Sequence, residues 1–153
     1  MSWAQKLKGW ATGETTPNGK ADLWALWGDL DREAHRLARH AEMAPNHLSE
    51  GELTRLAAEQ EAMAVKLRET LGETKAVASP AEPAPPAGLN HWARVVQNLE
   101  HMRSQRDRLF EAAQERNQEE ALGLVLEGLA LRMENQLLGL RALIARADPQ
   151  SLN

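Results

Sequence analysis

Residues 118–147 read QEEALGLVLEGLALRMENQLLGLRALIARA and predict one helix with apolar side chains on two faces. The first stripe has the three- and four-residue spacing of a buried helix face and comprises Leu122, Leu126, Leu129, Met133, Leu137, Leu140 and Ile144. The second stripe follows the same rhythm about half a turn away and comprises Leu124, Gly128, Leu131, Asn135, Leu138, Ala142 and Ala145. Because the core of a simple bundle covers one stripe of each helix, we expect the second stripe to contact something else.

The composition of the whole chain favours helices. Its 153 residues are rich in Ala, Leu, Glu, Gln and Arg, and they include no Cys and no Tyr. These abundant residues are strong helix formers, whereas the β-branched residues that favour strands are few. We therefore predict an all-α protein without disulfides, which suits a reducing compartment.

Four breaks divide the chain into two predicted helical hairpins. The breaks lie at residues 11–20, at Pro45, at the proline-rich residues 75–89 and at Asn117. The expected helices cover 21–43, 49–72, 90–116 and 118–147, and Ser49 with Glu52 predicts a capping box at the second. The hairpins would form an antiparallel four-helix bundle, unless the last two helices continue as one elongated coiled-coil-like rod. The full division is a short N-terminal amphipathic segment (1–12), a first hairpin (13–74), a Pro/Ala linker (75–89), a second hairpin (90–147) and a tail (148–153).

Each of the first three helices carries a predicted core stripe. The first is Leu23, Trp27, Leu30, Ala34, Leu37 and Ala41. The second is Leu53, Leu56, Gln60, Met63 and Leu67, with Ala57, Ala64 and Leu71 beside them. The third is Trp92, Val95, Leu99, Met102, Arg106, Leu109 and Ala113. A guanidinium in such a stripe either reaches solvent or meets a carboxylate, so Arg106 is expected to do the former or to pair with Glu61 or Glu127.

The sequence offers no pattern typical of catalysis. None of the five histidines stands in a Glu-x-x-His pair, and no Gly-rich phosphate loop or nucleophile motif is present. Asp31 and His35 share one helix face but would hold a metal only weakly, and the histidines are expected to be ordinary surface or flanking residues. We therefore predict no enzyme, no catalytic residue, no metal ligand and no cofactor, while a ferritin-like metal-binding bundle stays as an alternative.

Charge and hydropathy limit the classes of partner and the cellular location that we expect for the protein. The net charge of −4 is spread along the chain, without the basic face that nucleic-acid binding requires. The most apolar window, residues 121–131, is too short to span a bilayer and contains Glu127. The N-terminus lacks an apolar core of signal-peptide length. We expect a cytoplasmic protein without stable membrane insertion and without a nucleic-acid partner.

The first residues form a second candidate binding element. Trp3, Leu7 and Trp10 fall on one face of a short helix, with Lys6 and Lys8 nearby. Such a segment binds a groove, packs on its own bundle or crosses to another subunit. Because so short a helix is unstable alone, order there requires a covering surface.

Several segments resemble FlgN-type flagellar export chaperones. Residues 53–67, LTRLAAEQEAMAVKL, are similar to the second helix of that family, and residues 126–128 and 137–140 are similar to its last helix. The resemblance implies a cytoplasmic chaperone of flagellar type III secretion, which holds the C-terminal amphipathic helices of hook–filament junction proteins for the export gate. Two features depart from the family: the chain has no tyrosine to offer the gate, and Asn117-Gln118 replaces the usual Asn-Gly.

The residues of the second stripe suit protein binding independently of this resemblance. Gly128 would let a partner backbone approach closely, and Asn135 is a polar residue of the kind that fixes register. Glu127, Glu134 and Arg141 flank the stripe. Three occupants stay open: a client helix, the same helix of a second copy in a structural homodimer, or another part of the same chain.

Overall fold

The computed structural model describes residues 20–72 and 88–152, and within them it contains four helices. These are α2 (Ala21–Glu42), α3 (His47–Leu71), α4 (His91–Glu115) and α5 (Glu120–Arg146). The prediction of an all-α protein is confirmed, and the helix bounds fall within a few residues of those expected. The predicted N-terminal segment (1–12) and Pro/Ala linker (75–89, but for its last two residues) lie outside the described residues.

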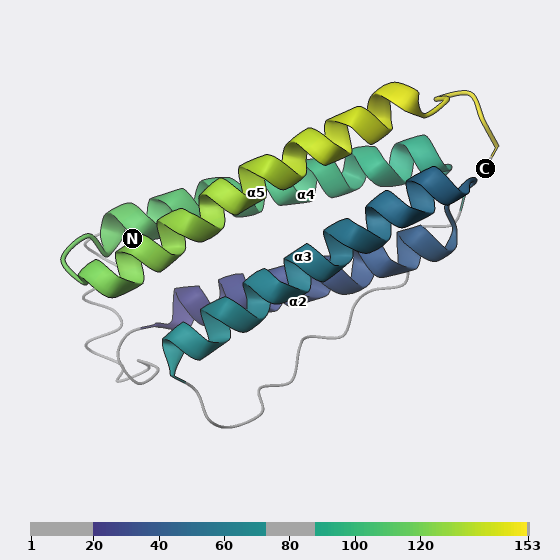
Figure 1. Ribbon diagram of the computed structural model, residues 1–153. Helices are drawn as coiled ribbons and strands as arrows, with labels where there is room; N and C mark the ends of the chain where they lie inside the picture. Colours follow the sequence, from purple (N-terminus) through teal and green to yellow (C-terminus); the bar gives the residue numbers. More distant parts are fainter. Residues whose placement is uncertain (1–19, 73–87, 153) are drawn as a thin grey trace.

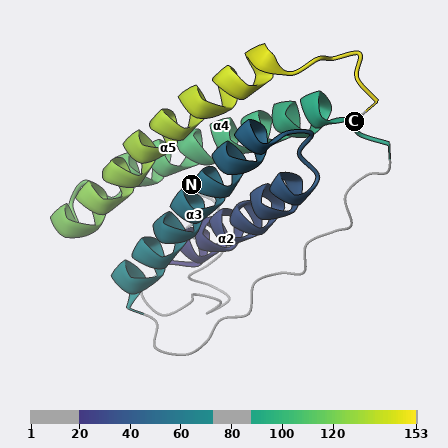
Figure 2. The same ribbon diagram turned by 45° about the vertical axis from the view of Figure 1, so that its right-hand side comes forward.

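The helices form two antiparallel hairpins that pack against each other (Figure 1). Helices α2 and α3 make one hairpin and α4 and α5 the other, with α2 against α4 and α3 against α5. Helix α3 ends and α4 begins at opposite ends of the bundle, as the turned view also shows (Figure 2). Neighbouring helices are therefore antiparallel all round, in the order up, down, down, up that requires one long crossover.

The predicted core stripes of α2 and α3 are buried in full, and so is that of α5 except for Ile144, which is partly buried. Leu30, Leu56 and Leu126 are completely inaccessible and belong to one continuous core. These helices follow the sequence pattern because the face of each helix with the most large apolar residues packs toward the other helices.

Helix α4 is rotated relative to the prediction. Val95, Met102 and Leu109 are buried as expected, whereas Trp92, Leu99, Arg106 and Ala113 are only partly buried. The remaining buried positions of the helix are His91, Arg94, Asn98, Gln105 and Ala112. The prediction was wrong here because polar side chains of α4 are buried by hydrogen bonding to the other hairpin.

The helix ends have identifiable causes. Asn46 caps α3, since its side chain accepts a hydrogen bond from the Ser49 backbone N–H over 2.8 Å. The predicted Ser49–Glu52 capping box is therefore wrong, because the helix begins earlier and Glu52 pairs with Arg55. Gly72 ends α3 with a φ of 75°, in the left-handed region that favours glycine. A turn at residues 116–119 separates α4 from α5, so the predicted break at Asn117 is confirmed and the continuous rod is excluded.

None of the described helices is long and apolar enough to cross a membrane.

Candidate functional site

The second stripe of α5 lies on the outer face of the bundle. The exposed fractions of Leu124, Leu131 and Leu138 are 62%, 50% and 60%, whereas the adjacent Leu137 is only 1% exposed. The other members, Gly128, Asn135, Ala142 and Ala145, are exposed as well. The described helices therefore leave the whole stripe uncovered, as the two-stripe pattern predicts.

The stripe has the form of a coiled-coil seam that is interrupted by one glycine. Its leucines recur every seven residues, and small residues or Asn135 stand between them. A Cβ added at Gly128 would meet no atom within 4 Å. The space between Leu124 and Leu131 can therefore receive a large side chain from a partner.

The two edges of the second stripe differ in charge. Glu120, Glu127 and Glu134 are exposed along one edge, which ends at Arg141. Arg106 of α4 comes within 3.9 Å of Glu134 and also contacts its neighbour Asp107 at 3.0 Å. The sequence predicts that Arg106 either reaches solvent or pairs with Glu61 or Glu127. Its guanidinium reaches the partly exposed surface, and the carboxylates that it contacts there are those of Glu134 and Asp107.

The opposite edge of the second stripe carries charges of both signs. Arg132 lies 3.5 Å from Glu59 of α3 and Arg146 is exposed near the end of α5. An acidic edge and a mixed edge on one apolar helix face would orient a charged amphipathic helix that binds there.

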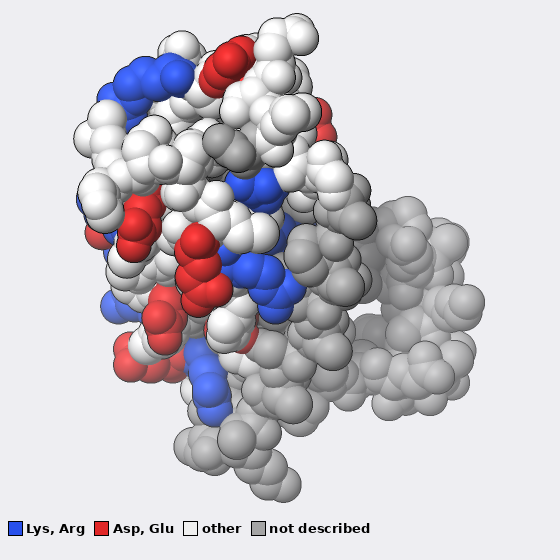
Figure 3. Space-filling model, turned by 90° about the vertical axis from the view of Figure 1, so that its right-hand side faces the viewer, with Lys and Arg blue, Asp and Glu red and all other residues white. Residues whose placement is uncertain are grey.

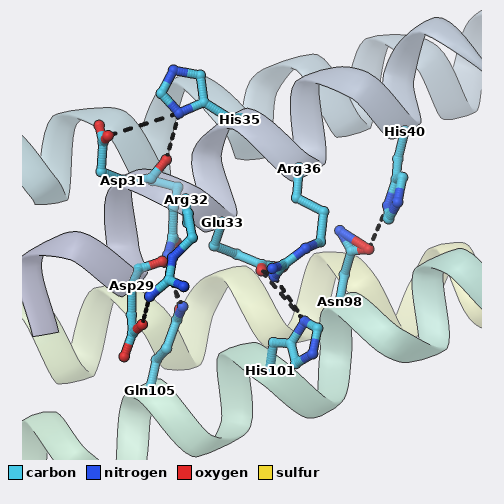
Figure 4. A network of polar contacts seen from close by, with 11 residues as sticks. Asp29, Asp31, Arg32, Glu33, His35, Arg36, His40, Asn98, His101 and Gln105 are labelled. Carbon is cyan, nitrogen blue, oxygen red and sulfur yellow. Dashed lines mark hydrogen bonds and ion pairs between the residues drawn. The ribbon is translucent and has the colours of Figure 1, made fainter. Parts of the chain in front are cut away.

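A second group of functional interest is a buried polar network between α2 and α4 (Figure 4). The carboxylate of Glu33 is completely inaccessible and pairs with Arg36 and with His101, whose Nδ1 lies 3.5 Å away. His40 donates from Nδ1 to the Asn98 amide oxygen over 2.6 Å. These contacts join the two hairpins through residues far apart in the sequence.

The network continues into the centre of the bundle. Gln105 of α4 accepts a hydrogen bond from Gln60 of α3 over 2.9 Å and donates to the Asp29 carbonyl of α2 over 3.1 Å. Gln136 of α5 donates to the sulfur of Met63 over 3.0 Å. Each helix thus places a polar side chain in the buried interior.

Burial and nearby cations change the protonation of this network. Burial lowers the pKa of His40 to about 4, with Arg94, Arg36 and Arg39 adding in the same direction, although the hydrogen bond to Asn98 opposes the shift. Burial also lowers the pKa of His91, again reinforced by Arg94. The expectation that the histidines are ordinary surface or flanking residues is wrong for these two, because polarity alone does not indicate whether a side chain has a buried partner.

A surface pocket of about 230 Å³ lies beside the network and is lined by Asp29, Arg32, Arg36, His101, Ser104, Gln105 and Arg108. Asp29 pairs with both Arg32 and Arg108, the latter over 2.6 Å. Since Asp29 pairs with Arg32 and Arg108 while Glu33 pairs with Arg36, the arrangement is that of an ion-pair network joining the two helices.

The described residues include no group of three or more His, Asp or Glu that could hold a metal ion. His35 Nδ1 lies 3.8 Å from the Asp31 carboxylate and 2.9 Å from its carbonyl oxygen, which is a local helix contact. Among the buried residues described, Glu33 is the single carboxylate, whereas a di-metal bundle uses several. This interior does not fit a ferritin-like metal centre.

Charge on the end face is mixed (Figure 3). This end, where α3 and α4 begin, shows acidic and basic side chains interspersed among uncharged ones. The described part of this face shows no continuous basic surface of the kind that would attract a phosphate backbone.

Of the predicted binding residues, the structure brings together those of the second stripe, while Trp3, Leu7 and Trp10 lie outside the described residues. The polar network was not predicted as a site. Comparisons of the chain with protein-family models, with curated proteins and with solved structures returned no significant match.

Proposed function

We propose that this protein is a protein-binding helical module, and that the second stripe of α5 receives an amphipathic helix of a partner protein. The observation that supports the proposal most directly is the exposure of Leu124, Leu131 and Leu138, which lie on one face at seven-residue spacing. Single exposed leucines are ordinary, but an aligned row on one helix is typical of helix-in-groove or coiled-coil recognition.

Burial of the three exposed leucines supplies a modest part of the binding energy of a reversible complex. Fully burying a leucine side chain is worth about 1.5–3 kcal/mol. Because the three leucines are already about half buried, each would contribute about 1 kcal/mol, to which the apolar face of the partner adds a similar amount. Most of the affinity must then come from close packing of the partner over Gly128 and from its contacts with the charged edges.

The charges favour one class of partner. Glu120, Glu127 and Glu134 line one edge, so a partner helix with Lys or Arg beside its apolar stripe gains electrostatic attraction. A helix with acidic residues on that side would be rejected. The proposed partner is therefore an amphipathic helix with a basic flank.

The finer proposal is a cytoplasmic chaperone of flagellar type III secretion, and it is supported by the resemblance of residues 53–67 and of α5 to FlgN-type chaperones. In that role the client would be the C-terminal amphipathic helix of a hook–filament junction protein. A chaperone of this kind binds its client reversibly, which agrees with a modest apolar surface.

The test is binding of a fluorescently labelled synthetic helix that carries leucines every seven residues and a lysine flank. We expect Leu131→Asp to weaken binding at least tenfold, since it places a charge in the apolar contact. Val65→Asp is the matched control, because Val65 is a similarly exposed apolar residue on α3. Equal binding by wild type and Leu131→Asp, or equal weakening by both variants, would contradict the proposal. The chaperone role is tested by repeating the titration with the C-terminal helix of a junction protein.

A structural homodimer formed by α5 is the second candidate. In a parallel pair of α5 helices, Glu127 would lie opposite Arg132 of the other copy, five residues further along, and Asn135 would face its own equivalent. Light scattering distinguishes the candidates: a dimer that Leu131→Asp converts to a monomer supports the homodimer, whereas a monomeric wild type excludes it.

A further inference from the structure

We infer that residues 3–10 of the same chain bind the first half of the second stripe, between Leu124 and Leu131, and compete there with the partner helix. The inference rests on the proposed function for its consequence, since it concerns the regulation of that surface. The occupancy itself is a separate statement and can be tested without any partner.

The apolar residues of the segment match the surface in length. In a helix, Trp3 and Trp10 would stand seven positions apart with Leu7 between them, and Leu124 and Leu131 of α5 are also seven positions apart. At 1.5 Å per residue both sets extend over about 10 Å. The open space above Gly128 lies between the two leucines, where an indole ring of the segment can enter and remove apolar surface from water.

The charges match as well. Lys6 and Lys8 accompany the apolar residues of the segment, and the edge of the second stripe beside them carries Glu120 and Glu127. The chain as a whole is acidic, with a net charge of −4. A basic amphipathic segment is therefore attracted to this acidic edge more than to a mixed surface such as the end face.

The connection is short enough to permit binding within one chain. Asp22, in the first turn of α2, pairs with Arg116 over 2.7 Å, and Arg116 stands in the turn that leads into α5. The nine residues 11–19 lie between the segment and the described chain and reach up to about 30 Å when extended. Gly128 lies only eight residues into α5, which is about 12 Å along the helix axis.

The expected binding is weak on its own and effective because it is intramolecular. A helix of so few residues is unstable in isolation, but a short tether supplies an effective concentration in the millimolar range. Such a segment covers the leucines when no partner is present and yields to a longer helix that fills the whole stripe. Removing its tryptophans should therefore strengthen partner binding.

Paramagnetic NMR on the full chain tests the occupancy. The chain contains no cysteine, so Ala4→Cys carries a single nitroxide. We expect the nitroxide to broaden the amide signals of Gly128 and Leu131 but not that of Gly51, an exposed glycine on α3. Adding Trp3→Gln and Trp10→Gln should abolish the broadening, and Glu127→Lys should reduce it.

Two outcomes would overturn the inference. One is equal broadening, or no broadening, at Gly128 and Gly51. The other is broadening that occurs only when spin-labelled chain is mixed with isotope-labelled chain, which would place the segment on a second copy. In the labelled-helix titration, Trp3→Gln with Trp10→Gln should tighten binding about fivefold if the segment covers the stripe in about 80% of molecules. Broadening without helix binding would refute the proposed function and leave the occupancy standing.

Discussion

Acidification below pH 6.5 should destabilise the bundle through His40. The side chain is 2% exposed and its Nδ1 donates to Asn98 across the contact between the hairpins. Burial lowers its pKa from 6.5 to about 4, assisted by Arg94. Protonation would leave a cation beside this guanidinium with little water to solvate it.

The sign and size of the effect follow from linkage. Between pH 6.5 and pH 4 the unfolded chain binds a proton at His40 that the folded chain does not, so the free energy of unfolding falls as the pH falls. With these two pKa values, stability at pH 5 should be about 2 kcal/mol lower than at pH 8, and the loss should approach about 3 kcal/mol near pH 4.

Urea unfolding of wild type and His40→Gln at pH 8 and pH 5 measures this contribution. The variant lacks the titrating group and keeps a donor for Asn98, so it should lose about 2 kcal/mol less than wild type on acidification. The comparison cancels the carboxylates and His91, which titrate in both proteins. His47→Gln is the control, since His47 is exposed, and it should behave as wild type. Equal losses in wild type and His40→Gln would refute the reasoning.

Three further predictions concern the helices themselves. Leu137→Ala should lower the free energy of unfolding in urea by about 2–5 kcal/mol, because Leu137 is buried. Leu138→Ala should change it by less than about 0.5 kcal/mol, because Leu138 is exposed. Similar losses in the two variants would show that Leu138 is covered. Asn46→Ala should lower stability in thermal unfolding by about 1 kcal/mol, because the N-cap of α3 is lost, and Ser49→Ala should lower it by less. A larger loss in Ser49→Ala than in Asn46→Ala would show that Ser49 is the cap. Gly72→Ala should destabilise the protein by about 1 kcal/mol, because Gly72 has a positive φ. Gly51→Ala should stabilise it by about 0.5–1 kcal/mol, since Gly51 is helical and an added Cβ meets open space. Calorimetry that shows a stability change of the same sign for both variants would contradict this.

The buried faces of α2 and α3 are predicted because their apolar residues leave one choice of register, and of the two apolar stripes of α5 the one with more large side chains is the buried one. The sequence of α4 is compatible with two registers. Val95, Met102 and Leu109 belong to both candidate stripes, one completed by Trp92 and Leu99 and the other by residues such as His91, Asn98 and Gln105. Hydrophobicity favours the α4 stripe with Trp92 and Leu99. Hydrogen bonds from the other hairpin stabilise the α4 stripe with Asn98 and Gln105 instead. A signal was present in Gln60, a polar residue inside the apolar stripe of α3 that needed a buried partner.

The candidate site was predictable for a related reason. Two stripes half a turn apart cannot both face one core, so the exposure of Leu124, Leu131 and Leu138 follows from helix geometry alone. The identity of the occupant does not follow, because a client helix, a second copy and residues 3–10 all present the same kind of apolar face. Charge along the edges is the property that discriminates among them.

Besides the continuous apolar core that they share, the two hairpins are joined by buried polar contacts. Across the seam, His40 bonds Asn98, Gln60 bonds Gln105 and Glu33 faces His101. A buried polar group costs about 1–3 kcal/mol when its partner is removed but adds little net stability when paired. The seam therefore selects one alignment of the hairpins more than it strengthens their association. Acid should accordingly loosen the contact between α2 and α4 first, while the second stripe, carried by α5 on the outer side of its own hairpin, keeps its shape. Helix binding at pH 5.5 should then persist in wild type even as its resistance to urea falls, and parallel loss of both would show that the stripe depends on the seam.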